Sequence, residues 1–490
     1  MSEKSMSLQE RSWIALLNAV LSRDRLRGTA LKIADKRIYH ALVEENPDGY
    51  PVRSQEDKYY LVRNLLHTFN RASKDGRIAP LVREAALKVF VGQILLDTDD
   101  VGAAFKEQYG FRPPGLLTLS PGKRCNLHCI GCYASSSATD AAKLSYDVAD
   151  RIVREKTELW GSHFTVISGG EPLMWKSQGK DIVDLAAAHP DNYFMMYTNG
   201  TLIDEKMAGR MADTGNLSPV ISVEGFEAET DVRRGKGVHR RILSAFERLR
   251  NAGVPFGISI TGTRNNADLI VSDPFVDFYF EEQGAIYGWI FQYMPIGREF
   301  TLDLMVTPEQ RLRMYHGIQR IIRERDVFIA DFWNSGPAGN GCIAGGRPGG
   351  YLYIDWNGNV SPCVFFPYTT DNILQIYRKG GNINEVLMSP LFKSVRKWQW
   401  EYGYDKPADQ VGNFLVPCPI RDHHLEAMKW VREAGAQPMD KAAAEAMGDM
   451  GYHRGLGAYG KKFAALTDDI WEREYIDPER KRKTYEKAVA

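Results

Sequence analysis

Three cysteines at close spacing are the residues of this chain best suited to chemistry. Cys125, Cys129 and Cys132 lie in the run 123–133 (KRCNLHCIGCY), a short polar loop that follows the apolar residues 116–119. Thiolates are soft ligands, and three of them on one loop suit a site for a thiophilic metal. Because three ligands leave one metal position open, such a site can also bind a substrate or a cofactor. We therefore expect the chemistry of the protein at this loop.

Two other interpretations of the loop are weaker. A zinc knuckle needs a fourth Cys or His close by, and His128 lies between two of the cysteines, where reaching the same ion would strain the loop. Buried free cysteines need no fixed spacing at all. The spacing therefore favours the thiophilic metal site with one open position.

The loop resembles the C-x3-C-x2-C signature of the radical S-adenosylmethionine (SAM) superfamily, including the aromatic Tyr133 beside the last cysteine. The resemblance implies that the three cysteines hold a [4Fe-4S] cluster whose fourth iron is chelated by the amino and carboxylate groups of SAM. It further implies that the cluster, reduced by a donor such as flavodoxin or ferredoxin, cleaves SAM to a 5′-deoxyadenosyl radical. That radical takes hydrogen from an unactivated C–H bond, while the protein positions the reactants and tunes the cluster.

A glycine-rich run follows the second apolar stretch, at residues 168–173 (SGGEPL). Paired glycines let backbone groups approach a ligand closely, and the carboxylate of Glu171 can accept from an ammonium. The run resembles the GGEP motif of the same family. That resemblance assigns Gly169, Gly170 and Glu171, together with Tyr133, to the SAM-binding surface.

Polar residues after the next two apolar runs complete the expected SAM site. Asn199 follows the third run, and Ser222 and Glu224 end the fourth, where the resemblance places the ribose and the methionine carboxylate. Residues 231–237 (DVRRGKG) resemble a D-x2-R-G-x2-G segment in which Arg234 would pair with that carboxylate, since a guanidinium matches a carboxylate bidentately. A solvated basic loop is the alternative, because Arg233 is adjacent and the sequence does not decide which arginine points inward. Residues 293–297 are expected to line the substrate side.

Three further cysteines, Cys342, Cys363 and Cys418, lie in the C-terminal third of the chain. Residues 351–360 (YLYIDWNGNV) predict a hairpin that turns at Asn-Gly and carries Cys342 towards Cys363. The arrangement resembles the "twitch" extension, related to the larger SPASM type, and implies an auxiliary [4Fe-4S] cluster. Its fourth iron would be open or bound by a residue among 422–424 (Asp, His, His). Structural zinc or unrelated core cysteines are the alternatives.

The elements that must position these residues alternate between strands and helices. Six apolar, β-rich runs separated by helical segments predict a parallel sheet, curved towards a partial (βα)6 barrel, with the site at the carboxyl ends of the strands. A helix is expected to begin at Pro308, with Thr307 as N-cap and Gln310 completing a capping box. The predicted strands are residues 116–119, 164–167, 193–197, 220–223, 257–260 and 289–293.

The fold class is therefore α/β, with the core at residues 113–326 and three flanking regions. Residues 1–112 predict a helical N-terminal domain, 327–425 the small cysteine-containing domain, and 426–490 a mostly helical tail with a flexible, glycine-rich joint at 451–460. The first helix, with its apolar residues 13–21 followed by Arg23, Arg25 and Arg27, suggests peripheral contact with an anionic membrane. Core packing or a dimer contact is the alternative.

Composition excludes several classes of protein. Lys plus Arg and Asp plus Glu both number 62, so nothing in the charge balance indicates a nucleic-acid partner. The six cysteines fall as one triplet and three singles, a metal pattern of a reducing compartment, and we expect a cytoplasmic protein. No run is long and apolar enough for a signal peptide or a transmembrane helix.

Together these features predict a radical SAM enzyme of an oxidoreductase or a C–C or C–S bond-forming type. An auxiliary cluster favours oxidation, cross-linking or rearrangement of the substrate over simple methylation. Analogy with enzymes that carry such extensions favours a peptide or protein substrate, and the basic N-terminus weakly favours a lipid or small metabolite. A non-catalytic electron carrier is the alternative from another class, but it would have no need of a methionine-binding surface.

Overall fold

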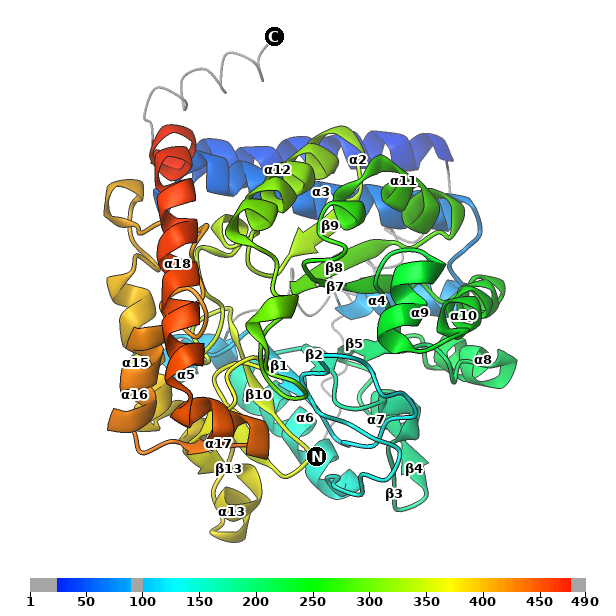
Figure 1. Ribbon diagram of the computed structural model, residues 1–490. Helices are drawn as coiled ribbons and strands as arrows, with labels where there is room; N and C mark the ends of the chain where they lie inside the picture. Colours follow the sequence, from blue (N-terminus) through cyan, green and yellow to red (C-terminus); the bar gives the residue numbers. More distant parts are fainter. Residues whose placement is uncertain (1–23, 90–99, 477–490) are drawn as a thin grey trace.

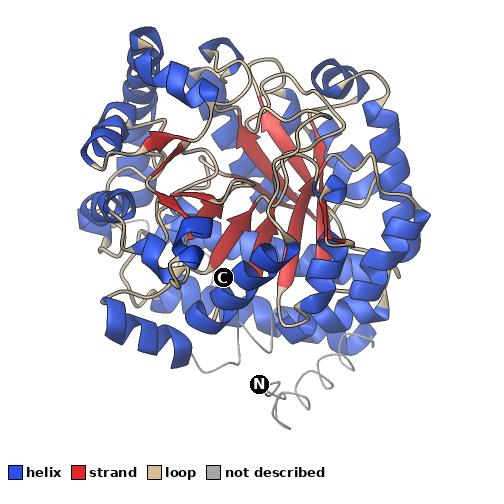
Figure 2. Ribbon diagram, turned by 90° about the horizontal axis from the view of Figure 1, so that it is seen from below, coloured by secondary structure: helices blue, strands red, loops and turns tan. Residues whose placement is uncertain are grey.

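The computed structural model describes residues 24–89 and 100–476, which surround one curved, mainly parallel sheet (Figures 1 and 2). The sheet has ten strands in the order β13-β11-β10-β1-β2-β5-β6-β7-β8-β9. Its strands are β1 (Leu116–Leu119), β2 (Phe164–Ile167), β5 (Tyr193–Thr198), β6 (Leu217–Val223), β7 (Gly257–Gly262), β8 (Tyr287–Gln292), β9 (Phe328–Asp331), β10 (Tyr351–Ile354), β11 (Asn359–Ser361) and β13 (Asp371–Asn372).

All six predicted strands are confirmed as β1, β2, β5, β6, β7 and β8, each parallel to the next. They are short apolar runs buried on both faces, as expected of parallel strands that helices cover. The covering helices lie outside the sheet in Figure 2. They are α6 (Tyr146–Trp160), α7 (Ile182–Ala188), α8 (Glu205–Thr214), α9 (Glu227–Arg234), α10 (Val238–Ala252), α11 (Asp273–Val276) and α12 (Pro308–Glu324).

The predicted capping box of α12 is confirmed. The Thr307 side chain accepts from the backbone of Gln310, and the Gln310 side chain accepts from the backbone of Thr307. The sheet continues past this helix, because β9 pairs with β8 and β10 pairs with β1, both in parallel. The core and the cysteine-containing region therefore share one sheet across residue 326.

The predicted hairpin is also confirmed, as the antiparallel pair β10 and β11. Its turn contains Gly358 with a φ of +79°, a conformation that favours glycine. The remaining strands of the described residues form two small antiparallel sheets. They are formed by β3 (Lys176–Ser177) with β4 (Lys180–Asp181) and by β12 (Tyr368–Thr369) with β14 (Gln437–Pro438).

The described part of the N-terminal region, residues 24–89 and 100–112, consists mainly of helices. It forms α2 (Asp24–Tyr39), α3 (Val52–Lys74), α4 (Pro80–Leu87) and α5 (Asp100–Tyr109). The long helix α3 lies beside α12 in Figure 1, and the two helices are in contact. The expected membrane-contacting residues 13–21 lie outside the described part of the chain.

The C-terminal residues pack as helices along one side of the molecule, where α18 lies beside α16 (Figure 1). These helices are α13 (Ile373–Arg378), α14 (Asn384–Leu387), α15 (Pro390–Glu401), α16 (His424–Glu433), α17 (Lys441–Gly448) and α18 (Met450–Trp471). None of the helices within residues 24–89 and 100–476 combines the length and hydropathy that a membrane span requires.

The prediction of a flexible, glycine-rich joint at 451–460 is wrong, because these residues lie inside α18. The glycines serve close packing instead. A Cβ on Gly460 would lie 2.0 Å from the carbonyl oxygen of Asp422, and a Cβ on Gly455 would lie 2.1 Å from the Leu302 side chain. Missing side chains thus let α18 approach its neighbours, which outweighs the low helix propensity of glycine.

Candidate active site

A cavity of about 310 Å³ lies where the carboxyl ends of the central strands converge. It contains the thiol loop and most of the residues expected to bind SAM. The predicted residues that line it are Cys125, Cys129, Cys132, Tyr133, Gly169, Gly170, Asn199, Ser222 and Arg234. The two that do not line it, Glu171 and Glu224, are buried directly behind it.

The thiol loop already provides hydrogen bonds to one of its sulfurs. The Leu127 backbone N–H donates to Cys125 Sγ at 3.4 Å, and Asn199 Nδ2 approaches the same sulfur at 3.9 Å. Burial raises the pKa of the Cys125 thiol to about 12, so the thiol keeps its proton until a metal displaces it. Donors aimed at a ligating sulfur are one of the means by which a protein tunes an iron–sulfur cluster.

Arg298 fixes the thiol loop from the opposite side, and the sequence analysis missed it. Its guanidinium donates to the carbonyls of Cys129, at 2.6 Å, and Ser136, and its backbone N–H donates to the carbonyl of Cys132 at 2.9 Å. A Cβ on the preceding Gly297 would lie 2.3 Å from the Tyr133 carbonyl, so the two segments touch through their backbones. The only signal in the sequence was the position of this residue directly after the 293–297 segment.

The two glycines of the GGEP run hold that run against the thiol loop. Gly170 donates its N–H to Gly122 O at 3.0 Å, and a Cβ on Gly170 would lie 2.1 Å from Lys123 O. Tyr133 ties the two segments together, because its hydroxyl contacts Ser168 Oγ at 2.6 Å and accepts from the Gly169 N–H at 3.1 Å. Glycine is required here for close backbone approach between protein segments.

Glu171 is committed to the protein itself in this structure. Its carboxylate accepts from the backbone N–H groups of Leu173 (3.1 Å) and Asn199 (2.8 Å) and from the Thr198 hydroxyl (2.7 Å). Burial raises the pKa of Glu171, and these three donors oppose that shift by favouring the charged form. The carboxylate therefore joins the ends of β2 and β5, and its contact with SAM stays a prediction.

Both adjacent arginines face the cavity. The sequence left open which of the two points inward, and in the structure both do. Arg233 and Arg234 line the cavity and both pair with Glu224 Oε1, at 2.6 Å and 2.5 Å. The other oxygen, Glu224 Oε2, is buried without a hydrogen-bond partner among the described residues. A buried acceptor without a donor is costly, and a ribose hydroxyl would satisfy it. Ser222 lines the same wall.

The donor set of the first cavity fits a [4Fe-4S] cluster bound to SAM. Three thiols line this cavity, cationic groups suit the carboxylate of SAM, and Glu224 Oε2 lacks a donor among the described residues. Within those residues, no three His, Cys, Asp or Glu side chains are placed as a site for a single metal ion. A cubane spreads its thiolates over different iron atoms and needs no such placement.

The second cysteine set lines another cavity, and its role as a ligand set stays a prediction. Cys342, Cys363 and Cys418 all line this second cavity. They are close enough to interact electrostatically, because Cys342 and Cys418 raise the pKa of Cys363 and Cys342 raises the pKa of Cys418. Backbone N–H groups of Ala344 and Phe365 lie 3.5 Å and 3.4 Å from the sulfurs of Cys342 and Cys363. Burial raises the pKa of the Cys418 thiol to about 12. These backbone N–H to sulfur contacts are of the same kind as the one between Leu127 and Cys125 in the thiol loop.

The three residues considered as a fourth ligand all have other partners. Asp422 forms fully buried ion pairs with Arg311, at 2.7 Å, and Arg421, at 3.0 Å. His423 Nε2 lies 2.9 Å from the Val416 carbonyl. His424 Nδ1 faces the Ile420 carbonyl at 2.8 Å, and its Nε2 faces His453. None of the three is free to turn to the cysteines without losing these contacts.

Comparison with known proteins gives one family. A model of the radical SAM superfamily matches residues 119–270. Mycofactocin maturase MftC of Mycolicibacterium smegmatis is 31% identical over 303 residues, which cover 59% of this chain and 74% of that protein. AdoMet-dependent heme synthase of Methanosarcina barkeri is 28% identical over 293 residues, covering 53% of this chain and 79% of that protein.

A solved structure has a similar fold. The crystal structure of Streptococcus suis SuiB aligns with a TM-score of 0.50 and 18% sequence identity, over 71% of this chain and 83% of that one. Together with the thiol loop at the strand ends and the identity to the maturase, these matches establish the family. The chain belongs to the radical SAM superfamily and is an enzyme of the radical SAM type.

Proposed function

We propose that this enzyme abstracts hydrogen from an unactivated C–H bond and that an auxiliary [4Fe-4S] cluster at Cys342, Cys363 and Cys418 supports an oxidation, cross-linking or rearrangement. When bound, the first cluster supplies an electron that cleaves SAM and yields the 5′-deoxyadenosyl radical. The observation that carries the proposal is the joint wall of the two thiol-lined cavities. They share Phe164, Met195, Trp289, Phe332, Ile343 and Phe365.

The residues around the first cavity have separate tasks in this proposal. Cys125, Cys129 and Cys132 hold the cluster, and Arg298 fixes the loop that carries them. Arg233 and Arg234 bind the carboxylate of SAM, because two guanidiniums share a single Glu224 carboxylate and leave net positive charge at the wall. Glu224 Oε2 accepts from the ribose. The aromatic wall excludes water from the radical.

The auxiliary cluster keeps one iron without a protein ligand in this proposal. Asp422, His423 and His424 are engaged elsewhere, which supports an open iron over a fourth side-chain ligand. An open iron can bind substrate directly, and a cluster next to the substrate can accept the electron that an oxidation releases. Flavodoxin or ferredoxin is the proposed donor of the first electron.

Two substrate classes have support. Analogy with enzymes that carry cysteine-containing extensions favours a peptide or protein side chain as the substrate. The relative named mycofactocin maturase is consistent with this class. The relative named heme synthase favours a small metabolite instead. The second cavity is large and lined mainly by apolar side chains, which also favours a small molecule.

The experiment is anaerobic reconstitution with iron and sulfide, followed by iron counting and by assay of 5′-deoxyadenosine after addition of reductant and SAM. Two [4Fe-4S] clusters predict about eight irons per chain, and about four in the variant Cys342→Ala/Cys363→Ala/Cys418→Ala, which should still form 5′-deoxyadenosine. The variant Cys125→Ala/Cys129→Ala/Cys132→Ala should form none. Equal iron content in the wild type and the first variant would refute the auxiliary cluster.

A further inference from the structure

The second cavity extends from the auxiliary cysteines through the inside of the sheet to the N-terminal helices. Its volume is about 880 Å³, near the upper end of the roughly 300–1,000 Å³ typical of small-molecule sites. Its wall includes Phe164, Tyr193, Tyr287 and Phe328, the first residues of four strands. The first cavity contains the thiol loop at the carboxyl ends of the central strands and meets the second cavity at the shared wall. The two cavities are therefore adjacent inside the curved sheet, and the radical site lies beyond their shared wall.

The helix α3 covers this space in an unusual orientation. Several of its polar residues are buried, and one of them, Asn64, donates to the carbonyls of Ile322 and Val327. Three of its apolar residues stay partly exposed among the described residues instead, Val62 at 38%, Leu65 at 36% and Leu66 at 37%. All three line the cavity. An apolar helix face that lines a large cavity is suited to an apolar guest.

The cavity wall has two charged side chains, Lys58 and Asp331. The Asp331 carboxylate accepts from Gln292 Nε2 at 2.7 Å and from backbone N–H groups, so it is fully engaged. Lys58 forms no ion pair or hydrogen bond with any residue that the structure describes. Burial and the neighbouring Arg347 lower the pKa of Lys58, and the carboxylate of Asp48 opposes that shift from a distance. Within the described chain, the lysine is therefore the charged group of the mainly apolar cavity wall that has no ion-pair contact.

Arg347 adds to the positive character of this corner. Its guanidinium donates to the carbonyls of Cys342 (2.6 Å), Gly339 (2.6 Å) and Pro348 (3.1 Å) and forms no ion pair with a carboxylate of the described chain. Two neighbouring cations that form no salt bridge with a carboxylate of the described chain attract an anionic group. A group bound there would lie at the auxiliary-cysteine end of the cavity.

We propose that the substrate is a long-chain aliphatic anion whose carboxylate or phosphate binds Lys58 and whose apolar body fills the second cavity. This inference rests on the proposed function and names its substrate class. The body reaches the wall shared by the two cavities, which brings an unactivated C–H group to the radical site. A peptide is disfavoured, because each residue would bring a backbone N–H and C=O that the apolar wall leaves without partners.

The test is ligand displacement on the full chain, reconstituted with iron and sulfide and supplied with SAM under anaerobic conditions. A fluorescent C18 polyene fatty acid is displaced by palmitate, hexadecyl phosphate, hexadecanol or an apolar hexapeptide with blocked ends. We expect one of the two anions to displace the probe at least ten-fold better than hexadecanol does. The better anion identifies the head group.

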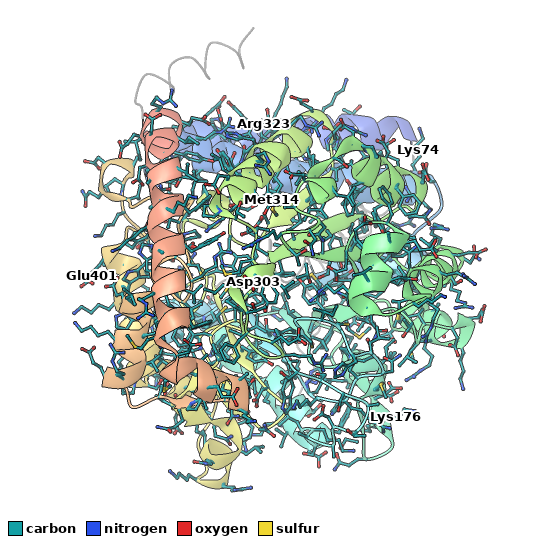
Figure 3. The ribbon with its side chains drawn as sticks, viewed as in Figure 1. Lys74, Lys176, Asp303, Met314, Arg323 and Glu401 are labelled. Carbon is teal, nitrogen blue, oxygen red and sulfur yellow. The ribbon has the colours of Figure 1, made fainter. Side chains whose placement is uncertain are left out.

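Matched variants locate the anion. Lys58→Met should remove the preference for the anion while hexadecanol binds as before, and Lys58→Arg should keep it. Lys74→Met changes an exposed lysine at the end of the same helix, labelled in Figure 3, and should behave as the wild type. Leu65→Glu should weaken all three amphiphiles.

The inference is overturned if no amphiphile displaces the probe, if Lys58→Met keeps the preference for the anion, or if only the hexapeptide competes. The last result would assign the cavity to a peptide. Because displacement does not depend on turnover, the two failures are distinguishable. A chain that binds the anion without forming 5′-deoxyadenosine would refute the proposed function, and with it the role of the anion as substrate, and would leave only the anion-binding site.

Discussion

Arg234 donates to Glu224 Oε1 at 2.5 Å, and both side chains are largely buried, Arg234 at the wall of the first cavity and Glu224 directly behind it. Arg233 shares the same oxygen at 2.6 Å. One carboxylate thus orients two guanidiniums and retains a buried oxygen without a partner in the described chain. This group can bind an anion and a hydroxyl at once, which are the two features that the methionine carboxylate and the ribose of SAM present.

Replacing Arg234 should weaken SAM binding. We expect Arg234→Met to raise the Kd for SAM at least ten-fold, measured by anaerobic equilibrium dialysis, because the variant loses a buried charge-assisted hydrogen bond. Arg248→Met is the control, since Arg248 forms an exposed pair with Glu205 away from the cavity. If Arg233→Met carries the whole loss and Arg234→Met none, Arg233 is the SAM ligand.

A side chain at Gly170 should push the GGEP run away from the thiol loop. In Gly170→Ala the added Cβ would lie 2.1 Å from Lys123 O, a backbone atom that cannot move without shifting the loop. We expect the iron bound at the first cluster to fall by more than half. Gly209→Ala, which meets nothing within 4 Å, should bind iron as the wild type does. Full iron content in Gly170→Ala would show that the loop adapts.

Filling the contact between α18 and the residues before α16 should destabilise the fold. Alanine normally stabilises a helix interior relative to glycine, but a Cβ on Gly460 would lie 2.0 Å from Asp422 O. We expect Gly460→Ala to lower the free energy of unfolding by about 1–3 kcal/mol, the usual cost of overpacking. Gly448→Ala has open space around its Cβ and should not be destabilised. Urea titration measures both, and equal stability of the two variants would contradict close packing at Gly460.

His424 should make the protein sensitive to mild acid. Burial lowers the pKa of His424 from 6.5 to about 4, so the unfolded chain takes up a proton below pH 6.5 while the folded chain does not. Its contribution to stability is therefore complete above pH 6.5 and is lost as the pH falls towards 4. The expected loss between pH 7 and pH 5 is about 2 kcal/mol.

The matching variant is His424→Gln, compared with the wild type by anaerobic urea titration at both pH values. We expect the free energy of unfolding of the variant to fall less than that of the wild type between pH 7 and pH 5. The difference should equal the loss that protonation of His424 causes in the wild type. The variant starts from a lower stability, since its side chain replaces the contacts with Ile420 and His453 imperfectly. An identical loss in the two proteins would assign the acid sensitivity to other groups.

The strands and the thiol loop could be predicted because their signals are local. Residues 164–167 are a continuous apolar run, and Cys125, Cys129 and Cys132 are close in sequence. The predicted hairpin was local as well, since an Asn-Gly turn joins its strands. The gathering of Cys342, Cys363 and Cys418 in one cavity was expected only from resemblance.

Contacts between distant segments could not be predicted. Arg298 reaches the carbonyls of the thiol loop, and its position after residues 293–297 does not by itself indicate that role. Gly455 and Gly460 resemble a flexible joint because local propensity disfavours helix there, and only tertiary packing explains their place in α18. The cavity at Lys58 is formed by segments from both ends of the chain, so composition gives no signal of it.

The pairing of β1 with β10 bears on how the protein is made. Leu116 lies opposite Tyr351, so the strand that leads into the thiol loop acquires its neighbour from the other half of the chain. At about 5–20 residues per second of synthesis, that edge of β1 waits roughly ten seconds or longer on the ribosome. An unpaired strand edge invites wrong partners during this interval. Iron–sulfur loading that precedes completion of the chain would meet a half-built sheet, so cofactor insertion is best timed after release.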